Sequence, residues 1–133
     1  MRLSTNPEMF TLPSTVWRVE FHVEEPLTHF PRPRAIQHSV ERHSGYRIDG
    51  SKRSDNDFHV FQYTLSGEGR FSKNGREASI GPGRGFLFTA NDPKVIYNYP
   101  RGEREAWVFG FISFYQANNM VNDLIDAFGH VYD

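Results

Sequence analysis

Residues 58–89 decide the fold, and they read FHVFQYTLSGEGRFSKNGREASIGPGRGFLFT. Short apolar runs alternate here with turns that contain glycine. Asn74-Gly75 is the strongest hairpin signal, because a type I′ turn needs two residues with positive φ and this pair tolerates both. The glycines at 66–69 and 81–83 mark two further turns for the same backbone reason. The stretch therefore predicts four short strands joined by tight turns.

Two more apolar runs follow, at residues 95–99 and 106–114. No stretch of helical periodicity of comparable length interrupts the six runs. Six short strands separated by such turns predict a closed or nearly closed antiparallel barrel, so the expected fold class is mainly β. A small barrel has an inside, and an inside lined with rings can hold a small molecule.

The chain before residue 58 carries weaker signals. Residues 16–23 alternate in polarity, which is the period of a half-buried strand. Arg18, Glu20 and His22 lie on its polar face. Residues 35–41 and 46–48 are further strand candidates, and residues 1–14 are expected to form an extended N-terminal arm. The apolar face of the 16–23 strand carries Trp17, Val19, Phe21 and Val23.

After Tyr115 the hydrophobic period becomes that of a helix. Gly129 stands where a C-terminal cap belongs, so the chain is expected to end close to the end of this helix. We therefore expect residues 15–115 to form the barrel and residues 116–133 to begin a helical region. The apolar stripe of the helix consists of Met120, Val121, Leu124, Ile125 and Phe128.

Composition excludes several classes of protein. A length of 133 residues suits one domain with a single core. The absence of cysteine excludes disulfides and thiolate metal sites. No apolar run approaches the roughly 20 residues of a membrane helix, so the expected location is the cytoplasm. A net charge of −1 argues against nucleic-acid binding by this segment, because phosphate-binding domains carry a basic excess.

The charge is nevertheless uneven, since basic residues crowd the stretch before residue 58. Three interpretations stay open: a solvated face, an anionic ligand group drawn to one of the arginines, or contact with a partner chain. The basic residues are Arg32, Arg34, Arg42, Arg47, Lys52 and Arg53.

Aromatic residues make up 15% of the chain. Strand geometry sends alternate side chains of the last run to opposite faces. If the more aromatic face is the inner one, it forms a continuous aromatic wall. We expect Trp107, Phe109 and Phe111 on the inner face, and Val108, Ile112 and Phe114 on the outer face.

The order of turns and strands from Phe58 to Phe114 resembles the N-terminal cupin-like sensor domain of AraC-type transcriptional regulators. That family has a Gly-x-Gly turn, a hairpin, a Pro-Gly-Asp turn, an apolar strand, a Pro-His loop and an aromatic strand. Two positions depart from the pattern: Arg84 replaces the usual aspartate, and Lys94 replaces the usual histidine. The resemblance implies a cupin-like jelly-roll barrel.

The resemblance also implies a function. In that family the effector lies inside the barrel, the N-terminal arm can fold over its mouth, and helices after the barrel pair two subunits. We therefore expect a small-molecule effector, a homodimer, and DNA contact only through a C-terminal domain outside this chain. Lys52 is an alternative to Arg53 as a ligand contact. The candidate ligand-binding residues are Arg53, Tyr63, Phe88, Ile96, Trp107, Phe109 and Phe111.

Neither a metal nor another cofactor is expected. His59 is the one histidine near a ligand position of metal-binding cupins, and an ammonium such as Lys94 has no free lone pair at neutral pH. One alternative is a small metal-free cupin enzyme, such as a sugar isomerase or epimerase, using His59 with Tyr63 or Tyr97. Another is a filled barrel that serves only for association, which an enclosed void of a few hundred Å³ would argue against.

Overall fold

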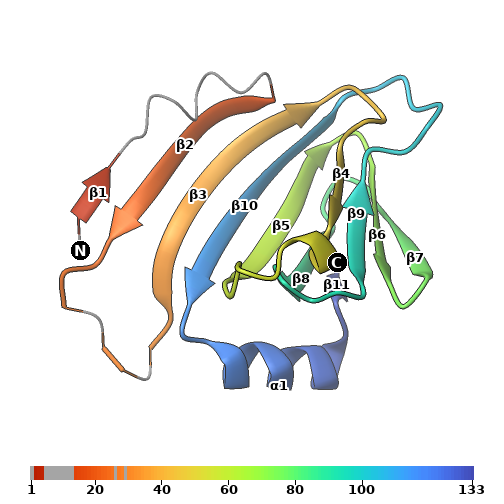
Figure 1. Cartoon of the computed structure of the whole chain (residues 1–133). Coiled ribbons are helices and arrows are strands. Elements are labelled where there is room, and N and C mark those ends of the chain that lie inside the picture. Colours follow the sequence, from red (N-terminus) through yellow and green to blue (C-terminus); the bar gives the residue numbers. More distant parts are fainter. Residues whose placement is uncertain (1, 5–13, 26, 29) are drawn as a thin grey trace.

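A computed structural model of the chain describes residues 2–4, 14–25, 27–28 and 30–133. These residues form two antiparallel sheets with one helix near the C-terminus (Figure 1). The large sheet has the order β1-β2-β3-β10-β5-β8-β11, and the small sheet has the order β4-β9-β6-β7. The strands of the large sheet are β1 (Arg2–Ser4), β2 (Thr15–His22), β3 (Arg32–Glu41), β10 (Trp107–Tyr115), β5 (His59–Ser66), β8 (Gly85–Thr89) and β11 (Val131–Tyr132). The strands of the small sheet are β4 (Arg47–Asp49), β9 (Val95–Asn98), β6 (Gly69–Lys73) and β7 (Arg76–Ile80).

The six predicted strands between residues 58 and 114 are confirmed, with ends shifted by one residue at most. The Asn74-Gly75 hairpin is confirmed as well. Asn74 has φ 54° and Gly75 has φ 77°, and the two residues join β6 to β7. The weaker strand predictions upstream correspond to β2, β3 and β4. Local turn chemistry therefore set the register of the β6–β7 hairpin, as the sequence predicted.

The core lies between the two sheets and consists largely of rings. Phe71 of the small sheet packs in a tilted arrangement against Phe86 of the large sheet, with ring centroids 4.8 Å apart. Tyr97 lies 5.0 Å from Phe88 in the same way. The expected division of β10 is also confirmed, because Trp107 and Phe109 belong to this core while Phe114 packs on the other side of the sheet. The buried members are Phe58, Val60, Phe71, Ile80, Phe86, Phe88, Ala90, Val95, Tyr97, Tyr99, Trp107 and Phe109.

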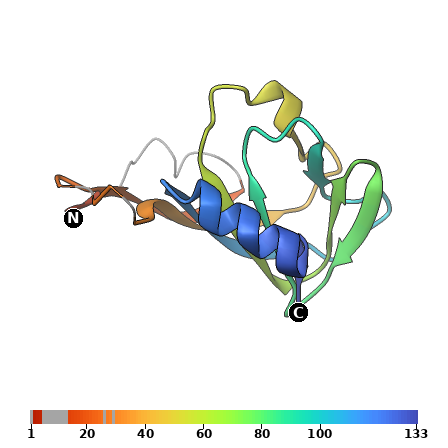
Figure 2. The same ribbon diagram turned by 90° about the horizontal axis from the view of Figure 1, so that it is seen from below.

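Helix α1 (Asn118–Phe128) crosses the end of the large sheet, as Figures 1 and 2 show from two directions. Val121, at 0% exposed, packs with Leu87 on the outer face of β8. Gly129 caps the helix with φ 82°, as predicted. The sequence did not predict β11, whose Val131 pairs with Phe86 of β8. The segment after the barrel therefore folds back onto the barrel.

The N-terminal region is described only in part. Residues 5–13, most of the predicted arm, lie outside the described residues. Arg2–Ser4 forms β1, which pairs with β2. A short 3₁₀ helix, η2 (Gly50–Lys52), follows β4. Within the described ranges, no helix combines the length and apolar character needed to cross a membrane.

Candidate functional site

The inner side of the large sheet beside the core is polar, and β2 supplies part of it. The predicted alternation of β2 holds from Trp17 to Glu20, after an irregularity in the register at its start, but the strand turns its polar face inward. Arg18 is only 5% exposed, whereas Trp17 is 42% exposed. The register explains this arrangement, because Arg18 pairs with Gln37 and Glu20 pairs with Ala35. The interpretation of β2 as a strand that buries its apolar face was therefore wrong at Trp17.

Hydrogen bonds organise this inner side around Gln37 of β3. The Arg18 Nη1 donates to Gln37 Oε1 at 2.7 Å. The Gln37 Nε2 donates in turn to Ser39 Oγ at 2.7 Å and to Thr15 Oγ1 at 3.2 Å. The Arg18 Nε also donates to the Glu20 carboxylate at 3.1 Å. Arg18 therefore has both a counter-ion and a neutral acceptor, and its charge is balanced within the protein.

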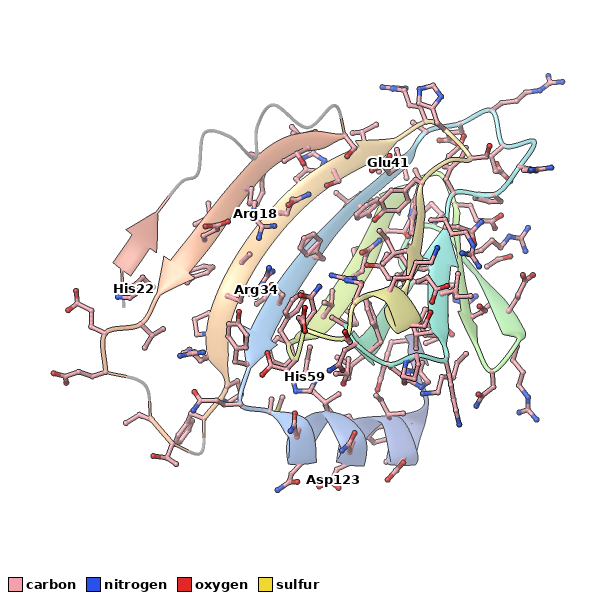
Figure 3. All side chains as sticks on the ribbon, in the orientation of Figure 1. Arg18, His22, Arg34, Glu41, His59 and Asp123 are labelled. Atoms are coloured by element: carbon pink, nitrogen blue, oxygen red, sulfur yellow. The ribbon has the colours of Figure 1, made fainter. Side chains whose placement is uncertain are left out.

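Arg34 reaches the same side through a β-bulge. Ser113 of β10 pairs with Ala35, and the next residue pairs with Pro33, so Arg34 is the extra residue of β3. A bulge of this kind re-aims a side chain. The Arg34 Nη1 donates to Ser113 Oγ at 3.3 Å, and its guanidinium carbon lies 3.8 Å from the ring centroid of Phe58. Figure 3 shows Arg18 and Arg34 on neighbouring strands.

Two more arginines lie over aromatic rings at this end of the barrel. Arg53 lies 5.5 Å from the Phe58 ring, and its Nη1 donates to the Tyr97 hydroxyl at 3.3 Å. Arg32 lies 4.6 Å from the ring of Tyr115. Among the described residues, no acidic side chain forms an ion pair with Arg32, Arg34 or Arg53. This end of the barrel therefore gathers three guanidinium groups that form no ion pair within the described part of the chain.

Burial adds to the cost of the Arg34 charge. Desolvation lowers the pKa of the Arg34 guanidinium, and the nearby Arg18 lowers it further, while the Tyr115 hydroxyl and the Glu20 carboxylate oppose this shift. A guanidinium nevertheless stays protonated in a protein. A half-buried cation beside a second cation is an environment that attracts an anion.

A second unusual group, Gln62 of β5, lies further into the barrel. Gln62 is 1% exposed, and its Nε2 has no hydrogen-bond partner. In the sheet register it faces Phe111 on one side and Phe86 on the other. Buried amide nitrogens without a partner are uncommon and call for an explanation. Arg18, Gln37, Phe111, Gln62 and Phe86 thus form one cross-strand row on the inner side of the large sheet.

The candidate ligand-binding residues named from the sequence fall into three places. Phe88, Trp107 and Phe109 are buried in the core and pack against other rings. Phe111 is partly buried at the margin of that core. Arg53 lies near two residues of the core, Phe58 and Tyr97.

Two of the candidates point away from the inside, and their assignment to the lining of the barrel needs correction. Tyr63 lies on the outer face of β5, where it is 42% exposed, because its neighbours Gln62 and Thr64 take the inward positions. Ile96 lies between Val95 and Tyr97, which both belong to the core, so strand alternation directs it outward.

The acid–base pairs considered for catalysis are not assembled. The His59 ring nitrogens are 2.9 Å from Thr89 Oγ1 and 2.8 Å from Asn118 Oδ1. Burial lowers the pKa of His59, while the hydrogen bond with Asn118 opposes that shift. Tyr63 is four residues further along the same strand, about 13 Å away at the usual strand rise. Tyr97 belongs to the core, on the other side of the sheet from His59.

His59 instead contributes to an open hollow of about 530 Å³ below the barrel. Its lining is polar and includes Asp57, Asn91 and Asn118. In the part of the chain that the structure describes, no group of three or more His, Asp or Glu side chains is placed to hold a metal ion. Arg84 and Lys94, the two residues that depart from the pattern of the resembled family, both form hydrogen bonds. Arg84 Nε donates to Asp133 Oδ1 at 2.7 Å, and the Lys94 backbone N–H donates to Asp92 Oδ1 at 3.0 Å.

Sequence reasoning missed much of the inner polar side. The basic stretch did point to Arg34, as one of several arginines that an anion could approach. Arg18, Gln37, Ser113 and Gln62 were not named as candidate site residues. The available signal was the period of two in β2 and β10, which groups Arg18 with Glu20 and Ser113 with Phe111. It does not show which of the two groups faces inward.

Comparison with known proteins gives one family match. Residues 35–114, more than half of the chain, match the family described as AraC-like ligand binding domain. No curated protein sequence matches the chain.

Several solved structures have a similar fold. One is the Cupin_2 domain of an XRE family transcriptional regulator from Enterobacter cloacae, with 14% identity, a TM-score of 0.39, and coverage of 60% of this chain and 81% of that one. Another is a putative sugar phosphate isomerase from Acidithiobacillus ferrooxidans, with 16% identity, a TM-score of 0.43, and coverage of 84% and 74%. A third is oxalate decarboxylase from Bacillus subtilis, with 13% identity, a TM-score of 0.41, and coverage of 90% and 37%.

Proposed function

Because the chain belongs to the AraC-like ligand binding domain family, we propose that it is the effector-sensing domain of an AraC-type transcriptional regulator. The effector is a small organic molecule, held on the inner side of the cupin-like barrel. The observation that carries this proposal is the row of polar side chains on the inner side of β2, β3 and β10. Some of these side chains form no ion pair with another described residue, and the row lies directly beside an aromatic core. A few convergent polar groups next to apolar surface are what a small-molecule site requires.

We place the effector at the margin of the core rather than inside it. Phe88, Trp107 and Phe109 already pack against other rings, so their proposed role is to support the site from behind. Phe111 and Arg53 remain the proposed contacts among the residues named from the sequence. Arg34 and Gln37 join them from β3.

The alternative is a small metal-free enzyme with a cupin fold, such as a sugar isomerase or epimerase. It would need a general acid and base within hydrogen-bond reach of one substrate. His59 is engaged with Thr89 and Asn118, and neither tyrosine considered as its partner is near it. These positions favour a binding domain over an enzyme.

The remaining parts of the proposal concern partners and domain division. We propose that the chain pairs with a second copy, that it acts in the cytoplasm, and that DNA contact is made by a different domain of the regulator. Residues 15–115 form the proposed sensor barrel, preceded by an arm at 1–14 and followed by a linker or dimerisation region at 116–133. A gel-shift assay with the neighbouring promoter checks the DNA claim, and sequence-dependent retardation by these 133 residues alone would contradict it.

The experiment that tests the sensing role is a thermal-shift screen of the protein against small organic molecules, followed by calorimetric titration of each compound that raises the melting temperature. Phe111→Ala should weaken binding of a true effector at least tenfold. Ile96→Ala removes an outward-facing apolar side chain of similar exposure and serves as the matched control. Binding that is unaffected by Phe111→Ala would contradict the placement of the site.

A further inference from the structure

We propose that the effector carries a carboxylate, and that the Arg34 guanidinium, held in place by the buried Ser113 hydroxyl, is the group that binds it. This inference rests on the proposed sensing function and adds the chemical class of the ligand. It concerns residues that the comparisons leave without a role.

The first observation concerns the charge of Arg34. The two inner arginines of β2 and β3 differ in their partners: Arg18 has Glu20 at 3.1 Å and Gln37 at 2.7 Å. Arg34 hydrogen-bonds to the neutral hydroxyls of Ser113 and Tyr115, and it feels the Glu20 charge without forming an ion pair with it. Among the described residues, Arg34 has no ion pair. Burying an unpaired charge is costly, and an anion that arrives with the ligand removes that cost.

The second observation is the geometry of the guanidinium. The Phe58 ring covers one face of the Arg34 group at 3.8 Å, so a ligand approaches its edge or its other face. The hydroxyls of Ser113 and Tyr115 leave part of the five N–H donors of the guanidinium for a ligand. The edges of a guanidinium match the two oxygens of a carboxylate, which can accept two parallel N–H bonds. Arg53, on the same Phe58 ring, adds charge of the same sign.

The third observation is the unpaired amide of Gln62, which points to a second polar atom on the ligand. Val60 pairs with Ser113 and Gln62 pairs with Phe111, so Gln62 and Ser113 are diagonal neighbours across β5 and β10. Diagonal neighbours are roughly 7–8 Å apart. An acceptor oxygen at about that distance from the carboxylate would satisfy Gln62 Nε2, with the apolar body of the ligand against Phe111.

The ligand class is therefore a small organic acid with an apolar body and a second, uncharged oxygen. Suitable probes are 4-methoxyphenylacetate and 6-oxoheptanoate, each compared with its primary amide. The amide keeps the size and the second oxygen but removes the negative charge. Inorganic phosphate is a further probe, since it shares the charge but lacks the apolar body.

The test measures thermal shifts and calorimetric affinities of these probes for the wild type, Arg34→Gln and Arg101→Gln. Arg101 lies exposed in a loop away from the inner side and provides the matched control. We expect at least one acid to stabilise the wild type and the control, its amide to bind at least tenfold more weakly, and Arg34→Gln to lose the preference for the acid. Ser113→Ala provides a second, smaller change if Arg34→Gln does not fold.

Specific results would overturn the inference. If an acid binds Arg34→Gln and Ser113→Ala as tightly as it binds the wild type, the subsite is wrong. If the amides bind as well as the acids, the effector is neutral and the proposed sensing function survives without the carboxylate. If phosphate competes fully with the acids, the site accepts anions without regard to the apolar body. If neither acids nor amides bind the wild type, the carboxylate inference fails, while the sensing role is decided by the separate effector screen.

Discussion

Phe109 and Phe111 share one face of β10 but have different surroundings. Phe109 is 1% exposed, with the Trp107 ring 4.6 Å away and the Tyr46 ring 6.0 Å away. Phe111 is only partly buried, and its cross-strand neighbours are the amides of Gln37 and Gln62. At the scale of single residues, packing therefore separates a structural ring from a ring that is available to a ligand.

The first prediction concerns these two rings. Phe109→Ala should lower the free energy of unfolding by about 3–5 kcal/mol, because it leaves a cavity in a packed core. Phe111→Ala should cost about 1–2 kcal/mol, because the ring gives up less buried area. Urea unfolding followed by circular dichroism measures both values. Equal losses for the two variants would contradict the distinction between them.

The second prediction concerns Gln62. Gln62→Leu keeps a similar volume and removes the buried amide nitrogen that has no partner. The free energy of unfolding should rise by about 1 kcal/mol, since an unsatisfied buried polar group is destabilising. The same denaturation experiment measures the change. A loss of stability would mean that the amide has a favourable partner in solution, such as an enclosed water molecule.

The third prediction is a pH dependence through His59, whose pKa burial lowers from its usual 6.5. The unfolded chain takes up a proton as the pH falls through 6.5, while the folded protein resists it. The free energy of unfolding should therefore fall from about pH 7 downward, until the lower folded-state pKa is reached. His59→Asn should reduce this dependence between pH 7 and pH 5.5. The same slope in both proteins would contradict the prediction, whatever other groups contribute.

At the scale of elements, β2 and α1 each place an apolar stripe differently from what their sequences suggest. The outward face of β2 exposes Trp17 at 42%, although this ring belongs to the apolar side of the strand. The stripe of α1 is split: Val121, Leu124 and Ile125 pack against the large sheet, while Met120 and Phe128 stay exposed. An amphipathic period therefore locates an apolar stripe without showing how much of it a neighbouring element covers.

The fourth prediction concerns the end of α1. Gly129 has φ 82° and ψ −174°, a backbone conformation that residues other than glycine rarely adopt. Gly129→Ala should cost about 1–3 kcal/mol of stability and loosen the junction between α1 and β11. Gly45→Ala is the matched control, because nothing lies within 4 Å of a Cβ there and its φ is not positive. Similar melting temperatures for the two variants would show that the cap contributes little.

At the scale of the whole molecule, the outer face of the large sheet carries an apolar surface that α1 covers only in part. Trp17, Tyr63, Leu65 and Ile112 are exposed there, around a shallow hollow of about 330 Å³. Phe61 belongs both to this hollow and to the cluster under α1, so the exposed and covered surfaces are continuous. Contiguous apolar surface of this kind commonly marks a protein interface.

The fifth prediction is that this outer apolar surface takes part in pairing with a second copy. Leu65→Glu should weaken self-association at least tenfold, because two apposed carboxylates and their desolvation oppose contact. Leu27→Glu changes another exposed leucine, outside this surface, and is the control. Phe128→Glu tests the alternative that the two copies pair through α1. Analytical ultracentrifugation over a range of concentrations measures the self-association of the three variants. A monomer at all concentrations in the wild type would contradict the dimer itself.

The sequence by itself determined the positions of the central strands and the helix. Asn74-Gly75, the glycine turns and Gly129 are local signals, because backbone sterics act on the residues that carry them. The period of two likewise assigned Trp107 and Phe109 to one face and Phe114 to the other. These features need no information from distant parts of the chain, so the local sequence is sufficient to predict them.

Only the tertiary structure decided what each face contacts. Alternation groups Arg18 with Glu20, but their burial depends on β3 lying beside them with Gln37 in register. Arg34 points inward because of a bulge in its pairing with β10, which lies far away in the sequence. Tyr63 and Ile96 point outward because the neighbouring residues of their strands take the core positions. Burial and charge balance are properties of the contacts between distant segments, and local sequence preferences do not contain them.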